Sequence, residues 1–268
     1  MTLSMRDFMP PAELVGLVRG AFFAEGTIPG GVDKVLPNGL VALVFNTGTP
    51  HRIGKSARPE DNPVFARSWF TAVQTTPLYN AVDGPIRAFG LLFEPPGAAA
   101  LFGVDQVDLA DRTLDARRVF PDEFVELGER VLANAEDEET HALLYDAMLE
   151  RRRAPLPAWL NALHATIVTC QGAVELELAY AAAGVSAAEV EEWFLSALGV
   201  TPEAYCRLHK TQALLSAIDP GGDVDWLTLA VRYGFSDPAA FAEAFHIHTG
   251  EAPETYLARL RGEPAVAP

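Results

Sequence analysis

Residues 184–205 read GVSAAEVEEWFLSALGVTPEAY, and residues 234–256 read GFSDPAAFAEAFHIHTGEAPETY. The second stretch repeats the first. Its opening glycine lies 50 residues after Gly184, and its final tyrosine, Tyr256, lies 51 residues after Tyr205. A pattern that recurs in this way indicates one supersecondary unit present twice.

Each copy has the pattern of a helix-turn-helix unit. A short apolar-faced helix stops at a glycine, and a serine, Ser186 or Ser236, then caps a second helix. The apolar residues Val190 and Phe194 lie four apart in the first copy, as Phe241 and Phe245 do in the second, so each pair shares one helix face. Between the copies, Thr201-Pro202 is expected to begin a long joining helix that ends at Pro220-Gly221-Gly222.

The first part of the chain has a different character. Apolar runs at 40–45 and 86–93 predict strands, with turns expected at 37–39, 46–48, 83–85 and 95–97. After Pro121 the apolar spacing changes to three and four, which predicts two helices. The predicted fold class is therefore α+β. We expect a β-rich domain with two trailing helices at 1–153, an all-α double helix-turn-helix domain at 154–262 and a tail at 263–268.

The repeated units resemble the DNA-binding domain of the AraC/XylS family of bacterial transcriptional regulators, over residues 165 to 261. The residues that carry the resemblance are Gly234-Phe235-Ser236-Asp237, Phe241, Phe245, Thr249-Gly250, Pro253 and Tyr256. The N-terminal part is similar to a β-rich sensor domain that precedes this module in one branch of the family. That similarity includes Leu36-Pro37-Asn38-Gly39 and Pro96-Gly97-Ala98-Ala99-Ala100-Leu101-Phe102-Gly103.

The resemblance implies a transcriptional regulator whose second helices enter the major groove of DNA. It also exposes a departure, because the family usually has arginine two residues before each phenylalanine, where this chain has Glu192 and Glu243. The cationic positions that usually follow are Leu195 and Ser196 in the first unit, and His246 and Ile247 in the second. The remaining DNA-contact candidates are Arg207, Lys210, Arg232 and His246.

The net charge of the chain is also unusual for a DNA-binding protein. The whole chain has 20 Lys and Arg against 36 Asp and Glu, a net charge of −16. From Pro155 to Pro268 there are five cationic and fourteen acidic side chains, a net charge of −9. Most of the affinity of proteins for nucleic acid comes from Lys and Arg that displace counterions from phosphates. We therefore expect weak DNA binding, or none, in the family's usual mode, although Glu192 and Glu243 could instead accept hydrogen bonds from adenine or cytosine.

Other roles stay open as alternatives. The module could have lost DNA binding and act through a protein partner with a basic surface or through a homodimer, or serve only as a scaffold for ligand sensing. The first domain could bind a small-molecule effector. An unrecognised enzyme is a distant alternative. Five aromatic residues of the β-rich domain are candidates for lining a ligand pocket, although core packing explains each of them as well. They are Trp69, Phe70, Tyr79, Phe89 and Phe93.

The sequence contains no convincing motif for catalysis or for binding a cofactor. The glycine-rich segment 48–56 has one residue too many between its glycines for a phosphate-binding loop, and open loop is expected after it. His51 is the only histidine among residues 1–112, and His246 and His248 point to opposite sides of a helix, so no metal site is expected. Cys170 and Cys206 are predicted to be buried, inert thiols. We therefore predict no enzymatic activity and no cofactor.

The start of the chain lacks an apolar signal core, and no run is long enough for a membrane helix. The expectation is a cytoplasmic protein without a membrane partner.

Overall fold

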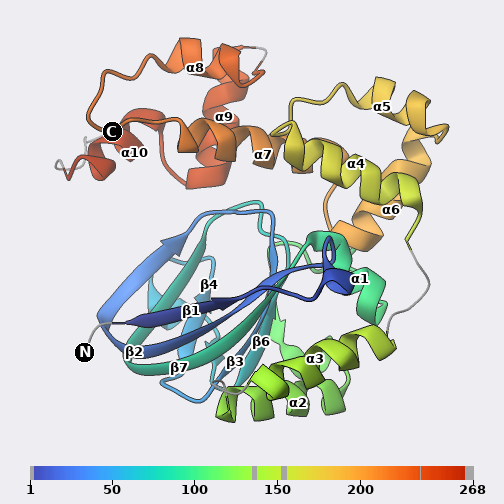
Figure 1. Cartoon of the computed structure of the whole chain (residues 1–268). Coiled ribbons are helices and arrows are strands. Elements are labelled where there is room, and N and C mark those ends of the chain that lie inside the picture. Colours follow the sequence, from blue (N-terminus) through green and yellow to red (C-terminus); the bar gives the residue numbers. More distant parts are fainter. Residues whose placement is uncertain (1–2, 135–137, 152–155, 236, 263–268) are drawn as a thin grey trace.

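The computed structural model describes residues 3–134, 138–151, 156–235 and 237–262. Its N-terminal domain is built on one antiparallel sheet that curves round on itself (Figure 1). The strand order is β1-β2-β7-β3-β6-β8, and β4 pairs with both β7 and β5. The strands are β1 (Ser4–Phe8), β2 (Val18–Val35), β3 (Val41–Asn46), β4 (His51–Gly54), β5 (Val64–Phe65), β6 (Ser68–Thr71), β7 (Leu78–Phe93) and β8 (Thr113–Asp115).

Both predicted strands are present, as β3 and the second half of β7, but two predicted turns are wrong. Strand β7 runs straight through 83–85, because β2 carries a bulge between Ile28 and Gly31 opposite Gly84 and Val82. The bulge absorbs the irregular backbone that a Gly-Pro pair imposes. Residues Pro95 and Pro96 begin helix α1 instead of a turn. The backbone N–H groups in the first turn of a helix have no acceptor within the helix, so proline, which lacks this N–H, is well tolerated there.

Three helices accompany the sheet (Figure 1). They are α1 (Pro95–Phe102), α2 (Asp122–Ala133) and α3 (Glu138–Arg151), and the last two are the predicted trailing helices. Helices α1 and α2 contribute Phe102 and Phe124 to an aromatic core with Phe120, where the ring centroids of Phe102 and Phe120 lie 4.9 Å apart. Burial of these rings against the sheet stabilises this domain.

The C-terminal module is all helix and confirms the α+β fold class. Its helices are α4 (Ala158–Thr169), α5 (Leu176–Ala183), α6 (Ala187–Leu198), α7 (Pro202–Ser216), α8 (Trp226–Arg232), α9 (Pro238–Thr249) and α10 (Pro253–Leu260). We call α5 and α6 the first unit and α8 and α9 the second unit. Helix α7 joins the units and begins where predicted, with the Thr201 hydroxyl accepting the Ala204 N–H at 3.2 Å. It ends at Ser216, four residues before Pro220.

The hydrophobic core does not follow the predicted division of the chain. One continuous cluster extends from the sheet residues Phe89 and Phe93 to Val190 and Phe194 of the first unit. The second unit has a cluster of its own, which joins Phe241 and Phe245 to α7, α8 and α10. The predicted boundary at 153/154 lies outside the described residues, as does the tail at 263–268. Among the described residues, no helix is both long and apolar enough to cross a membrane.

Candidate nucleic-acid interface

The second helix of each unit begins at a side-chain cap. Ser186 accepts the Glu189 N–H at 3.2 Å, as predicted. In the second unit the cap is Asp237, which accepts the Ala240 N–H at 2.8 Å. The prediction of Ser236 as the cap is therefore wrong, and Ser236 itself lies outside the described residues. The Asp-Pro pair explains the shift of one residue, since aspartate suits the cap and proline the first helical position.

The acidic positions of these helices face outward. Glu192 on α6 and Glu243 on α9 are exposed, as is the neighbouring Glu191. The opposite faces of the two helices are anchored by Phe194 and Phe245, which are fully buried. The carboxylates therefore lie on the solvent-exposed sides of α6 and α9.

Most of the module's few cations are already engaged within the protein. Lys210 donates to the Gly234 carbonyl at 3.2 Å, and Arg259 pairs with Glu251 at 3.1 Å. Arg261 donates to two carbonyls of the loop after α7, at 2.8 and 2.6 Å. Arg207 and Arg232 are exposed and form no ion pair with any described residue, although the Arg232 guanidinium lies 5.9 Å from the centre of the Tyr233 ring.

The structure brings only some of the predicted contact residues together. Arg207, Lys210 and Glu243 line one cleft of about 430 Å³ between α7 and α9, together with Glu203. Two cations and two carboxylates share this cleft, so it offers no net positive charge to phosphate. Arg232 and His246 do not line it, and His246 is exposed on another side of α9.

The N-terminal domain holds the end of α6. The Gln106 backbone N–H donates to the Ser196 carbonyl at 2.8 Å, and the fully buried Gln106 side chain donates to the Ala197 carbonyl and, at 2.9 Å, to the Pro95 carbonyl. These bonds also satisfy carbonyls that the end of a helix leaves unpaired. Sequence reasoning missed Gln106, because a lone glutamine in the loop between α1 and β8 belongs to no recognisable motif.

The five aromatic candidates for a ligand pocket lie in three different surroundings. Phe70, Phe89 and Phe93 are buried in the core that the helices cover. Trp69 packs in a separate cluster with Ile53. Tyr79 is partly exposed on β7.

The remaining sequence candidates have structural roles. Segment 48–56 contributes β4, and its Lys55 binds Asp111 at 2.6 Å, far along the chain. Burial raises the pKa of the Cys206 thiol to about 11, so it stays protonated and inert. Cys170 is exposed, which contradicts the prediction that it is buried, because it lies just beyond the end of α4. No group of three or more metal-ligating side chains occurs within the described ranges.

Comparison with protein families finds two matches. Residues 180–259 match a family described as a helix-turn-helix domain, and residues 6–115 match a domain of unknown function, DUF6597. A search of curated proteins finds no match.

Three solved structures align with most of this chain at low sequence identity. ToxT from Vibrio cholerae aligns over 96% of this chain and 98% of its own, with 8% identity and a TM-score of 0.44. ToxT of strain SCE256 with a bound unsaturated fatty acid aligns over 99% and 97%, with 10% identity and a TM-score of 0.42. The AraC-like transcriptional activator CuxR aligns over 85% and 100%, with 14% identity and a TM-score of 0.33.

The fold and the matched domains define a class, that of two-domain helix-turn-helix proteins with a β-rich N-terminal domain. Within that class, the C-terminal module is a helix-turn-helix domain of the AraC type, and the domain in front of it matches DUF6597.

Proposed function

We propose that this AraC-type regulator binds duplex DNA weakly or not at all in the family's usual mode. The observation that carries the proposal is the exposure of Glu192 and Glu243 on the two second helices. Near the phosphates of DNA these carboxylates cost binding free energy, because duplex DNA carries about one negative charge per 1.7 Å of its axis.

Most Lys and Arg side chains of the module already have partners within the protein, which supports the same proposal. Three of the five Lys and Arg of the module are bound to carbonyls or to Glu251, so they must give up existing contacts before they can reach phosphate. Arg207 and Arg232 are left for that task. A protein that contacts six to ten phosphates is typical of tight binders, and two cations fall far short of this.

The test is fluorescence anisotropy with a labelled duplex of random sequence, at several salt concentrations. We expect no binding by the wild type at low salt. The double change Glu192→Arg with Glu243→Arg should produce measurable binding. The logarithm of its association constant should fall linearly with the logarithm of the salt concentration, with a slope of about −2 for two new phosphate contacts.

A matched control separates local charge from total charge. Glu60→Arg with Glu123→Arg makes the same change in net charge at exposed positions of the N-terminal domain. This control should bind no better than the wild type. Tight, salt-sensitive binding by the wild type would refute the proposal, and equal gains in both double variants would show that Glu192 and Glu243 do not face the duplex.

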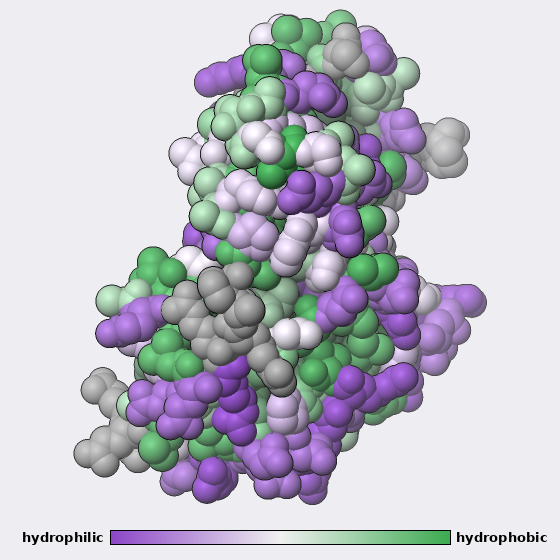
Figure 2. Space-filling view, turned by 90° about the vertical axis from the view of Figure 1, so that its right-hand side faces the viewer, coloured by the Kyte–Doolittle hydropathy of each residue, from purple (hydrophilic) through white to green (hydrophobic). Residues whose placement is uncertain are grey.

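A second candidate function is binding to a protein with a basic surface. Exposed carboxylates cluster on α5 and α6, at Glu177, Glu189, Glu191 and Glu192, and Leu178 beside them is 71% exposed. Figure 2 looks onto this side of the molecule, where hydrophilic and hydrophobic side chains are interspersed. Affinity purification from the native cells should recover a basic partner with the wild type but not with Glu191→Ala and Glu192→Ala combined. Equal recovery with both would exclude this surface.

A further inference from the structure

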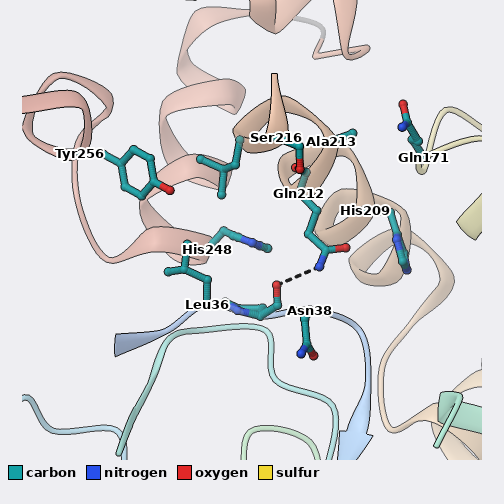
Figure 3. Close-up of a pocket in the computed structure, with 11 residues that line it drawn as sticks. Leu36, Asn38, Gln171, His209, Gln212, Ala213, Ser216, His248 and Tyr256 are labelled. Atoms are coloured by element: carbon teal, nitrogen blue, oxygen red, sulfur yellow. Dashed lines mark hydrogen bonds between the residues drawn. The ribbon is translucent and has the colours of Figure 1, made fainter. Parts of the chain in front are cut away.

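Helix α7 borders a hollow on each of two faces. One face meets the turn between β2 and β3, and Figure 3 shows Gln212 donating to the Pro37 carbonyl there, at 3.2 Å. The pocket of about 540 Å³ at this contact has no Lys, Arg, Asp or Glu among the described residues that line it. The other face borders the cleft of about 430 Å³ between α7 and α9, which we call the inter-unit cleft. None of the described residues that line the inter-unit cleft belongs to the N-terminal domain.

Two glycines let the backbone approach α7 closely beside the inter-unit cleft. Gly172 has a φ of +77°, and a Cβ there would collide with the Cys206 carbonyl oxygen. The turn that contains Gly172 brings Val174 to the wall of the cleft. Gly234 has a φ of +76°, and its carbonyl accepts a hydrogen bond from the Lys210 Nζ at 3.2 Å. The turns before α5 and before α9 are therefore held against α7, because glycine alone adopts this backbone without strain.

Most of the lining of the inter-unit cleft is apolar. The apolar side chains are buried or partly buried, and Cys206 among them is 6% exposed. Burial raises the pKa of the Cys206 thiol to about 11, so this part of the lining is uncharged near pH 7. It suits a hydrocarbon side chain, which gains free energy when it leaves water. The residues are Val174, Leu176, Cys206, Phe235, Ala240, Ala244 and Ile247.

Charged side chains supply the polar part of the lining. Glu203 and Arg207 lie four residues apart on α7 and are therefore neighbours on its surface, and Glu243 lines the wall formed by α9. All three are exposed, and none forms an ion pair with another described residue. Among the described residues of the lining there is no Ser, Thr, Asn, Gln, Tyr or His. An uncharged polar molecule would therefore find few partners in this cleft.

The two signs of charge restrict the ligand further. A simple anion would approach Glu203 and Glu243, and a simple cation would approach Arg207 and Lys210, so each would meet like charges. A zwitterion avoids both conflicts. Its carboxylate can accept two parallel N–H bonds from the Arg207 guanidinium, and its ammonium can donate to Glu203 one helical turn away.

We propose that the inter-unit cleft binds a free α-amino acid with an apolar side chain. Its two charges are carried on one carbon, which suits Glu203 and Arg207, because Cβ atoms four residues apart on a helix are about 5–6 Å apart. Its side chain packs against the apolar part of the lining. The volume of the cleft is within the usual range of about 300–1,000 Å³ for sites that bind small molecules. The proposal is independent of whether the module binds DNA.

The test measures binding of L-leucine, L-methionine and L-phenylalanine to the full chain without DNA, by calorimetry and saturation-transfer NMR. At least one of them should bind. Its N-acetyl and amide derivatives each lack one charge and should bind at least about tenfold more weakly, because each loses hydrogen bonds to a charged group. L-leucyl-L-leucine should also bind more weakly, since its two charges are farther apart. No binding by the three amino acids, or equal or tighter binding by a derivative or by the dipeptide, would overturn the proposal.

Two pairs of variants locate the binding. Arg207→Ala should weaken the bound amino acid at least about tenfold. Its control, Arg232→Ala, removes an exposed arginine that does not line the cleft and should leave the affinity unchanged. Ala240→Phe fills the cleft without a change of charge and should weaken binding, whereas Ala239→Phe at the exposed neighbouring position should not. Wild-type affinity in Arg207→Ala or in Ala240→Phe would place the amino acid elsewhere and overturn the proposal.

Discussion

The two helix-turn-helix units have the same sequence pattern but are attached to the rest of the protein in different ways. The first unit shares one continuous core with the sheet, and Gln106 of the N-terminal domain holds the end of its second helix. The second unit has a core of its own, and the N-terminal domain meets it through the Lys34–Glu251 ion pair and the packing of Leu36, and meets the joining helix α7 through Gln212.

This difference shows how one motif can have two roles in one chain. An element with few contacts to its surroundings opens at a lower free energy than one that belongs to the main core. The first unit is therefore fixed relative to the sheet, whereas the second unit can open or shift without disturbing it.

The largest expected effect comes from the buried phenylalanine of each unit. Phe194→Ala and Phe245→Ala should each cost about 3–5 kcal/mol, since both rings are fully buried. Hydrogen exchange should distinguish the two variants. Phe194→Ala should raise exchange in β7 and in the first unit, whereas Phe245→Ala should raise it in α8, α9 and α10 alone. Faster exchange in the sheet of Phe245→Ala would refute the separation of the two cores.

Acid should loosen the second unit. Burial lowers the pKa of His248 to about 4, from about 6.5 in the unfolded chain, so the unfolded chain binds the proton more tightly. Stability is then complete above pH 6.5 and falls toward pH 4, by up to about 3 kcal/mol for this one group. Urea unfolding at pH 7 and pH 5 should show a smaller loss in His248→Leu than in the wild type. An equal loss would show that His248 is not buried as a neutral ring.

The smallest effect concerns the glycine after each second helix. Gly199 and Gly250 have φ values of +79° and +71°, so alanine at either site costs about 1–2 kcal/mol of backbone strain. A Cβ at Gly199 would also lie 2.8 Å from the Gln106 carbonyl oxygen, whereas at Gly250 the nearest atom is the flexible Lys34 Nζ at 3.6 Å. Gly199→Ala should therefore lose at least about 1 kcal/mol more in denaturant unfolding than Gly250→Ala. Equal losses would mean that the contact with Gln106 is loose.

Local chemistry made much of the molecule predictable. Ser186 and Thr201 start their helices as expected, because capping depends on residues only three positions apart. The apolar run of β3 and the spacing of Phe194 and Phe245 also gave the right elements, since burial imposes the period of a strand or helix on the sequence. The outward position of Glu192 and Glu243 follows from the same periodicity, because each lies two residues from a buried phenylalanine.

Contacts between distant parts of the chain were not predictable from the residues. A bulge in β2 turned the expected break at 83–85 into continuous strand, and the five aromatic pocket candidates were divided between two core clusters and a partly exposed site on β7. Gln106 forms hydrogen bonds with the end of α6, about 90 positions along the chain. One pocket brings together His209, His248 and the turn at Pro37, which lie from about 40 to more than 200 positions apart. The sequence by itself determined the helix-turn-helix units and their acidic character, because both depend on neighbours along the chain. Only the tertiary structure decided which unit is fixed to the sheet and where an uncharged pocket forms, because these depend on which buried surfaces pack together.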